Sequence, residues 1–256
     1  HYMKLLQHLL TRGLDLDDPQ TTIIRKRIIN EKPFLKQIYQ EWYGWIARSL
    51  PEGEGPVLEL GSGAGFLNEY VSPLITSEIF FCNFVDAILD GCDLPFKNGS
   101  LKGIVFVDVL HHLPRAEGFF KEAARCIRTG GRIVMVEPWI TPWSKFIYTR
   151  LHHEPLDTGA SEWKFPSTGP LSGANSALPW IIFCRDRKIF ERDYPQLKIS
   201  SIKAGMPFRY LLSGGISLRS IMPGWSFPLW KKVEERFDPW SNKLGMFARI
   251  VLERAA

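Results

Sequence analysis

The chain has 256 residues, of which 45% are apolar, 23% charged and 13% aromatic, so it can bury a large core without disulfide bonds. Lysine and arginine exceed aspartate and glutamate by 32 − 27 = 5, and the basic residues are scattered, so nucleic acid is not expected as a partner. The four cysteines have no Cys-x-x-Cys spacing, which disfavours a zinc or disulfide framework. We find neither a signal peptide nor an apolar run of about 18 residues, and we expect a cytoplasmic protein.

Two helices are predicted in the first 52 residues, where they form an N-terminal helical cap. Apolar residues recur at steps of three and four from Leu35 to Leu50, which is the pattern of one buried helix face, and Pro33 suits the first turn. The segment 15–30 has an acidic start and predicts a second helix.

After this cap, short apolar runs alternate with glycine-rich turns and helical patterns, which is typical of a parallel α/β sheet. Residues 57–60 predict a buried strand, and a helix is expected to begin near Phe66. Helical periodicity covers 116–128, with Gly130 and Gly131 as its C-cap. The other strands expected in this part of the chain are 78–81, 87–89, 103–109 and 132–138.

The alternation ends after Trp139, where a stretch rich in Trp, Pro, Ser and Gly predicts a lid folded over the domain. Two closing strands are predicted at 197–205 and 246–254, with a second aromatic insert at 222–237 between them. We therefore expect one structural domain, divided into a cap, an α/β core, a lid and a closing part, at 1–52, 53–140, 141–196 and 197–256.

The turn after the first strand is the strongest candidate for ligand binding. It carries Gly61, Gly63 and Gly65 at the C-terminal edge of the predicted sheet, where open α/β folds bind ligands. A nicotinamide fingerprint would need glycine in place of Phe66, and no Gly-Lys-Ser or Gly-Lys-Thr follows as in a P-loop. Glu59 lies inside the apolar strand, and a buried carboxylate favours a cationic ligand group over a pyrophosphate. A nucleotide-dependent oxidoreductase is therefore disfavoured.

A second set of motifs lies between residues 90 and 139. Its members are Asp90 with Leu94-Pro95-Phe96, Leu110-His111-His112, Thr129-Gly130-Gly131 and Glu137-Pro138. With the glycine turn, they resemble the class I S-adenosylmethionine-dependent methyltransferases that act on small molecules. The resemblance implies an α/β fold with a Rossmann-like, mostly parallel seven-stranded sheet and helices on both faces. The sequence pattern adds the N-terminal helical cap and the aromatic-rich C-terminal inserts to this fold.

The resemblance also implies S-adenosylmethionine as cofactor, S-adenosylhomocysteine as product, and a set of cofactor contacts. Asp90 would accept a hydrogen bond from the adenine amino group, the Gly91 amide would face the ring, and Val107 would lie beside the amino-acid part. The methionine end would be held by Glu59 and the backbone around Gly61, Ser62, Gly63 and Gly65.

The ribose contact departs from the family pattern. The family has an acid at the end of its second strand, where this sequence offers Asn83 and then Asp86. Asparagine can form a hydrogen bond with a hydroxyl group, but this hydrogen bond is weaker than one to a carboxylate. Because Gly65 and Asp90 are only 25 residues apart, we expect no helix between the second and third strands.

The candidate catalytic residues are acids and histidines near the ligand-binding edge: His111, His112, Glu137, His152 and His153. His111 and His112 follow a strand end, where a general base would be useful, although packing and capping of a turn is an equal alternative. His152 and His153 with Glu154 form a second polar group, which suits a substrate pocket better than a metal site. No metal site is expected.

The sequence thus predicts methyl transfer to an oxygen, nitrogen or carbon atom of a small-molecule acceptor. Sugars, lipid-linked glycans, quinone-like rings and secondary metabolites stay open as acceptors, as does the oligomeric state. The alternative is a non-catalytic or regulatory protein that binds S-adenosylmethionine. The segment 222–232, with Trp225, Phe227, Trp230, Lys231 and Lys232, could instead touch a membrane surface.

Overall fold

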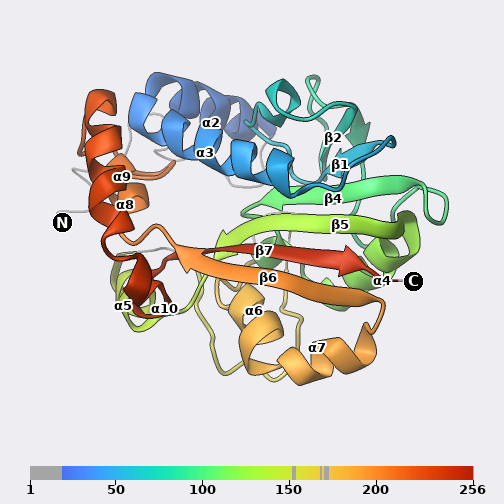
Figure 1. The fold of residues 1–256 in the computed structure, drawn as a ribbon. Helices are drawn as coiled ribbons and strands as arrows, with labels where there is room; N and C mark the ends of the chain where they lie inside the picture. Colours follow the sequence, from blue (N-terminus) through green and yellow to red (C-terminus); the bar gives the residue numbers. More distant parts are fainter. Residues whose placement is uncertain (1–18, 152–153, 168, 170–172, 256) are drawn as a thin grey trace.

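The computed structural model describes residues 19–151, 154–167, 169 and 173–255 of the chain. Its centre is a seven-stranded sheet in the order β3-β2-β1-β4-β5-β7-β6 (Figure 1). All adjacent strands are parallel except β7, which runs antiparallel to both β5 and β6. The predicted mostly parallel sheet and the two predicted closing strands are thus confirmed. The strands are β1 (Val57–Glu59), β2 (Leu74–Glu78), β3 (Ala87–Ile88), β4 (Leu101–Val107), β5 (Ile127–Pro138), β6 (Leu197–Gly205) and β7 (Phe247–Arg254).

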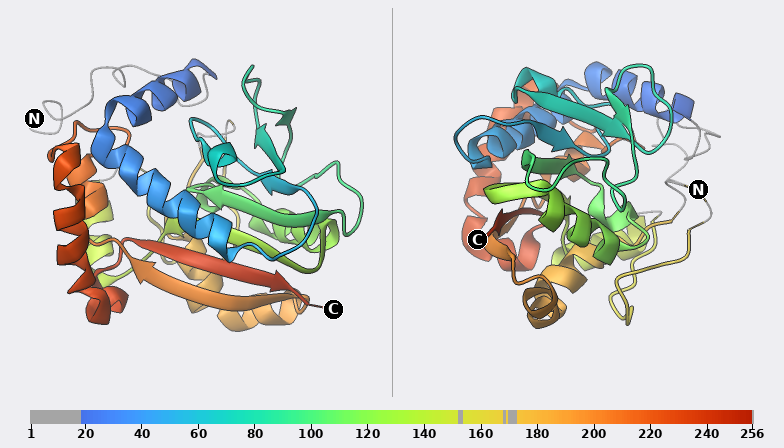
Figure 2. Two further views of the ribbon diagram at one scale, coloured as in Figure 1. Left: turned by 45° about the horizontal axis from the view of Figure 1, so that its top comes forward. Right: turned by 90° about the vertical axis from the view of Figure 1, so that its right-hand side faces the viewer.

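Helices cover both faces of this sheet, as predicted (Figures 1 and 2). The α-helices are α2 (Pro19–Glu31), α3 (Pro33–Ser49), α4 (Ala116–Cys126), α5 (Pro142–Leu151), α6 (Leu178–Trp180), α7 (Arg187–Asp193), α8 (Arg209–Ser213), α9 (Phe227–Glu235) and α10 (Ser241–Leu244). The shorter turns are η2 (Leu67–Glu69), η3 (Leu110–His112), η4 (Ile181–Arg185), η5 (Gly224–Ser226) and η6 (Asp238–Trp240).

Two apolar cores form because side chains alternate between the faces of each strand. Val57 and Val105 pack with the buried face of α3, whereas Leu58 and Phe106 pack with α4 and α7 on the other side. The helix predicted from Leu35 to Leu50 is confirmed, and its apolar positions are buried as expected. The other predicted N-terminal helix is confirmed over the described residues from Pro19 onward.

The region after the glycine turn differs from two sequence predictions. The second strand is Leu74–Glu78 and not 78–81, because backbone pairing with β1 fixes its register over 74–76. Phe81, expected inside that strand, is 70% exposed. The helix expected near Phe66 is a single 3-10 turn, whereas the missing helix between the second and third strands is confirmed within the described chain.

The glycine pair after α4 is a further correction. The helix ends at Cys126, and Ile127 already has extended backbone, so Gly130 and Gly131 lie inside β5 and not at a helix C-cap. Gly130 has a φ of +75°, and a Cβ on Gly131 would lie 2.7 Å from the carbonyl oxygen of Lys102. The glycines therefore allow the bulge by which β5 changes register against β4.

The two C-terminal inserts lie in different places. Within the predicted lid, Phe183 and Phe190 pack edge-on against Phe120 of α4, on the sheet face opposite α3. The second insert, predicted at 222–237, is part of a longer segment from α8 to α10, which packs at the end of the sheet beside α3. Among the described residues, we find no helix with the length and apolar character needed to cross a bilayer.

Candidate active site

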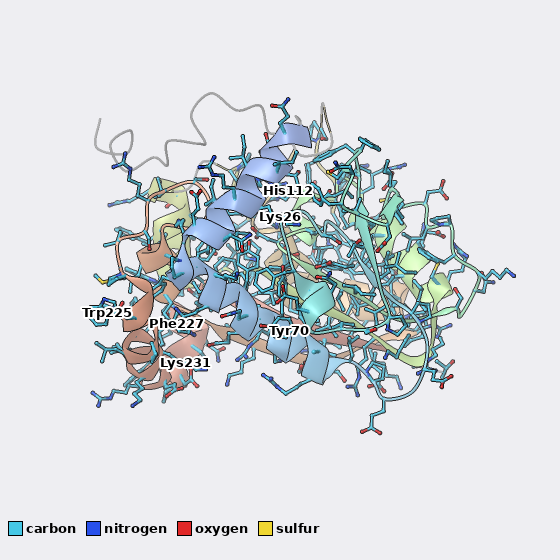
Figure 3. The ribbon with its side chains drawn as sticks, turned by 90° about the horizontal axis from the view of Figure 1, so that it is seen from above. Lys26, Tyr70, His112, Trp225, Phe227 and Lys231 are labelled. Atoms are coloured by element: carbon cyan, nitrogen blue, oxygen red, sulfur yellow. The ribbon has the colours of Figure 1, made fainter. Side chains whose placement is uncertain are left out.

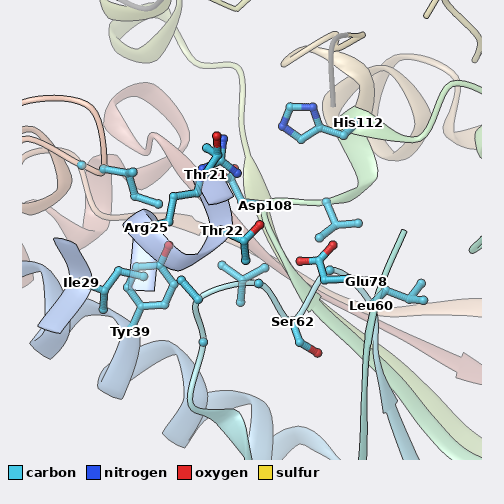
Figure 4. Close-up of a pocket in the computed structure, with 18 of the residues that line it drawn as sticks. Thr21, Thr22, Arg25, Ile29, Tyr39, Leu60, Ser62, Glu78, Asp108 and His112 are labelled. Atoms are coloured by element: carbon cyan, nitrogen blue, oxygen red, sulfur yellow. The ribbon is translucent and has the colours of Figure 1, made fainter. Parts of the chain in front are cut away.

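A cavity of about 1000 Å³ opens at the carboxyl ends of β1, β2 and β4. The turns after these strands form one wall, and α2, α3 and the segment 210–221 form the opposite wall and roof (Figure 4). Figure 3 shows α2 and α3 running across the molecule on this side. This edge of the sheet is where the topology of open α/β folds places ligands.

The glycine turn is built for close approach of a ligand to the backbone. Gly61 and Gly63 have φ values of +60° and +48°, which residues with a Cβ adopt only with strain. A Cβ on Gly65 would lie 2.4 Å from the hydroxyl oxygen of Tyr43. Ser62 fixes the turn to β2, because its N–H donates to the carbonyl oxygen of Ser77 at 2.8 Å and its hydroxyl accepts from the Ser77 N–H at 3.0 Å.

Two buried carboxyl groups face this turn. Glu59 is 5% exposed, and burial raises its pKa to about 8 against a hydrogen bond from Ser62. Glu78, at the end of β2, is 7% exposed, and burial also raises its pKa, opposed by hydrogen bonds from the backbone of Ile79 and Gly63. Both carboxyl groups line the cavity, so a cationic or hydroxyl-bearing ligand would relieve the cost of burying them.

The structure brings eight of the ten predicted cofactor residues to the cavity. They are Glu59, Gly61, Ser62, Gly63, Gly65, Asp90, Gly91 and Val107. Asn83 and Asp86 are exposed and lie outside the lining, and the Asp86 carboxylate accepts from the backbone and hydroxyl of Thr76 at 2.9 and 2.7 Å. Because the second strand ends three residues earlier than predicted, Glu78 takes the place at the cavity that the sequence analysis gave to Asn83.

Two of the predicted catalytic residues are fully buried behind the cavity wall. The Glu137 carboxylate accepts from the N–H groups of Val109 and Leu110, both at 2.8 Å, and lies 2.8 Å from Nδ1 of His111. Neither Glu137 nor His111 lines the cavity, so they position the turn that follows β4. Burial lowers the pKa of His111, but Asp108, Glu137 and Glu154 outweigh it and raise the pKa well above its usual value.

His112 is the predicted catalytic residue that reaches the cavity (Figure 4). Burial, with the neighbouring His111, lowers the pKa of His112 to about 3. Asp108 also lines the cavity, and burial raises its pKa to about 7 against the opposing effect of His111. His152 and His153 lie outside the described residues, and Glu154 directly after them lines the cavity.

The sequence analysis missed several lining residues and assigned no role to others. Asp108 could have been suspected, because it follows the fourth strand at the ligand-binding edge, and its φ is +63°. The tyrosines gave no such signal, because their spacing also fits a helix core. The missed lining residues with polar groups include Arg25, Tyr39, Tyr43, Glu78, Asp108, Tyr148 and Tyr210.

Hydrogen bonds and ion pairs join two parts of the roof that are far apart in the sequence. Buried Lys32, between α2 and α3, donates from Nζ to the carbonyl oxygens of Gly215 and Leu218, the latter at 2.8 Å. Arg209 of α8 pairs with Glu41 of α3 at 2.9 Å. Burial alone would raise the pKa of Glu41, but Arg209 and Lys231 lower it to about 2.

The surface beyond the roof carries part of the predicted membrane-contact segment. Trp225 is 80% exposed, whereas Phe227 is buried and Lys231 lies 3.1 Å from Glu41 (Figure 3). Phe227 and Lys231 therefore contact the rest of the protein and are not free to enter a membrane. Membrane contact of this segment stays a prediction.

Comparison with known proteins agrees with this architecture. Residues 58–135 match the family model described as a methyltransferase domain. No curated protein sequence matches the chain. Geranyl diphosphate C-methyltransferase from Streptomyces coelicolor A3(2), solved with Mg²⁺, geranyl diphosphate and S-adenosyl-L-homocysteine, has a TM-score of 0.51 at 14% identity, over 98% of this chain and 89% of that chain.

Two further structures have similar folds. A geranyl diphosphate methyltransferase solved with S-adenosylmethionine has a TM-score of 0.52 at 14% identity, covering 96% of this chain and 94% of the other. A chain from the complex between the Haloferax volcanii Trm112 methyltransferase activator and a methyltransferase has a TM-score of 0.53 at 13% identity. The match covers 94% of this chain and 98% of that chain. At such identities the similarity shows the fold.

The fold and the matched region agree with each other. Residues 58–135 match a methyltransferase domain, and the sheet of the whole chain has the fold of the class I S-adenosylmethionine-dependent methyltransferases. The strand order, the glycine turn at the end of β1 and the carboxylate at the end of β2 fit S-adenosylmethionine, because they offer backbone donors and hydroxyl acceptors at one sheet edge.

Proposed function

We propose that this protein is an S-adenosylmethionine-dependent methyltransferase and that it acts on a small-molecule acceptor, which binds between the cofactor cradle and the roof of the cavity. The observation that carries the proposal is the single continuous cavity, which holds the glycine turn at one side and a wall of tyrosines and aliphatic side chains at the other. Its volume of about 1000 Å³ lies at the upper end of the range for small-molecule sites, ~300–1000 Å³, and leaves room for a second ligand.

The cofactor contacts follow from the residues that line the cradle. The Gly61–Gly65 backbone and Glu59 would hold the amino-acid end, and Asp90 with Gly91 would hold the adenine ring. Glu78 would accept hydrogen bonds from both ribose hydroxyl groups, in place of Asn83 or Asp86. A carboxylate makes stronger hydrogen bonds to hydroxyl groups than an amide does.

The acceptor side supports a ligand with an apolar body and a polar reacting group. Tyr39, Tyr148, Tyr210 and Leu211 line this side, with Arg25 at its edge. S-adenosylmethionine supplies a methyl group on a sulfonium, which is already activated. The main task of these side chains is therefore to hold the acceptor atom in line with the methyl group and to exclude water. A small acceptor, geranyl diphosphate, is also named for a protein of similar fold.

The test is calorimetric titration of the folded protein with S-adenosylmethionine and S-adenosylhomocysteine, with NAD as control. We expect micromolar binding of both sulfur compounds and none of NAD, followed by methyl transfer in a screen of small acceptors. Binding without transfer to any acceptor would favour the non-catalytic alternative. Absence of binding, in protein shown to carry no retained ligand, would refute the proposal.

A further inference from the structure

We infer that His111, His112 and Glu154 form a binding site for a divalent transition-metal ion of the Zn²⁺ type. The site lies in the cavity wall just past β4, where His112 and Glu154 line the cavity and His111 is fully buried next to His112. The ligand atoms of His111, His112 and Glu154 all lie within 4.8 Å of one another. None of the sequence motifs pointed to this arrangement, because Glu154 is more than forty residues away from the two histidines.

The first line of evidence is the orientation of His111. Its Nδ1 lies 2.8 Å from a carboxylate oxygen of Glu137, whose other oxygen already accepts two backbone N–H groups. The hydrogen of the ring is therefore on Nδ1, and Nε2 is directed to the cavity wall. This Nε2 is buried and has no hydrogen-bond partner among the described residues. A carboxylate that holds a histidine in this way is the usual outer partner of a metal-binding histidine.

The second line of evidence is that His112 has the same arrangement. Its Nδ1 lies 3.2 Å from the carbonyl oxygen of Gly173, which can only accept, so Nδ1 donates and Nε2 carries the lone pair. That Nε2 lies 3.7 Å from a carboxylate oxygen of Glu154. A lone pair directed at a carboxylate is repelled, unless a cation lies between the two.

The third line of evidence is the spacing of the atoms. Nε2 of His111 lies 3.4 Å from one carboxylate oxygen of Glu154, and Nε2 of His112 lies 3.7 Å from the other. These distances exceed the ~2.7–2.9 Å of a charge-assisted hydrogen bond. They approach the separation of about 3.3 Å expected between two ligands of a tetrahedral ion with bonds of ~2.0–2.1 Å.

An ion-pair network without metal is the competing explanation. A protonated His111 would satisfy its own contacts with Glu154 and Asp108. It would leave the lone pair of His112 directed at Glu154, which the metal site explains. Two imidazoles and one carboxylate suit Zn²⁺ and its neighbours in the first transition row, whereas Mg²⁺ prefers oxygen ligands alone.

The position of the site suggests a consequence that rests on the proposed function. An ion held by His111, His112 and Glu154 would be reached from the cavity, so an acceptor with an oxygen ligand could bind to it directly. The acceptor would then be oriented by the metal, and its hydroxyl group would be polarised. The metal site itself does not depend on this step.

The experiment is titration of the chelator-treated, folded protein with Zn²⁺ by calorimetry, and with Co²⁺ followed by its visible absorption. We expect one ion per chain, an absorption spectrum typical of low-coordinate Co²⁺ with nitrogen and oxygen ligands, and no comparable binding of Mg²⁺. His112→Ala and Glu154→Gln should each weaken Zn²⁺ binding at least tenfold, and the outer-partner variant Glu137→Gln by about 10–100-fold. His112 and Glu154 are partly exposed at the cavity, so their variants are expected to fold.

Glu78→Gln is the matched control, since Glu78 is another buried carboxyl group of the same cavity outside this cluster. It should leave Zn²⁺ binding unchanged while weakening S-adenosylhomocysteine binding, and Glu154→Gln should do the reverse. Zn²⁺ binding without S-adenosylhomocysteine binding would overturn the proposed function and leave the metal site standing. The metal site is refuted if folded protein binds no Zn²⁺, or if His112→Ala and Glu154→Gln bind it as tightly as the parent chain.

Discussion

Substitution of Glu78 by glutamine tests how the cavity holds the cofactor. The side chain keeps its size, and the residue stays at the end of β2 beside the glycine turn. The amide has one acceptor oxygen where the carboxylate has two, and it carries no charge. We therefore expect Glu78→Gln to fold as the parent chain does and to bind S-adenosylhomocysteine more weakly.

The magnitude follows from the hydrogen bonds that are lost. A hydrogen bond to a charged group contributes about 1.5–3 kcal/mol, and the amide gives up about one such bond to the ribose. This corresponds to a dissociation constant raised about 10–150-fold. Glu78 is 7% exposed, so water does not replace the lost acceptor easily.

Calorimetric titration with S-adenosylhomocysteine measures this loss, and circular dichroism checks the fold. Asn83→Ala and Asp86→Asn are the matched controls, because both residues are exposed and lie outside the cavity. Their affinities should stay within about twofold of the parent chain. If Glu78→Gln bound as tightly as the parent and one of the controls did not, the ribose assignment would be wrong.

Gly61→Ala should lower the free energy of unfolding by about 1–3 kcal/mol in urea titrations, because it adds a clash to a strained φ. Gly130 has a similar φ, but a Cβ there would have no neighbour within 4 Å, so Gly130→Ala should lower the free energy of unfolding less. An equal decrease in the two variants would show that the clash at Gly61 contributes nothing. Asp90→Ala should weaken S-adenosylhomocysteine binding several-fold at an unchanged melting temperature, and unchanged affinity would remove the adenine assignment. Glu41 has a pKa lowered to about 2 by Arg209, so its contribution of about 3 kcal/mol is complete above pH ~4.5 and is lost as the pH falls toward 2. In urea titrations, the free energy of unfolding of the parent chain should decrease from pH 6 to pH 3, and that of Glu41→Gln should decrease less. If the free energies of the two chains changed with pH in parallel, the role of the ion pair would be refuted.

The sequence predicted the fold well where spacing and periodicity act locally. The glycine turn, the α3 face and the closing strands depend on neighbouring residues. The second strand was misplaced because Ile79 and Phe81 continue an apolar run, although pairing with β1 covers only residues 74–76 and pairing with β3 ends at Glu78. A register set by hydrogen bonds to another strand leaves no local signal.

The candidate site was predicted in part for the same reason. Eight cofactor residues reach the cavity because they follow strand ends, which one sheet edge brings together. The contact between His112 and Glu154 depends on the path of a long irregular segment, which no periodicity fixes. The Gly130 bulge was misread because a glycine pair after a helix has the same sequence in a C-cap and in a strand.

The bonds of Lys32 to Gly215 and Leu218 join two segments of the roof that are far apart in the sequence. The cofactor cradle, in contrast, comes from one continuous stretch between residues 57 and 109. Substitutions that alter acceptor choice can therefore accumulate at both ends of the chain without disturbing the methyl donor. They must do so in matched pairs, since a change at the α2–α3 junction that displaced this ammonium group would also displace the segment around Gly215.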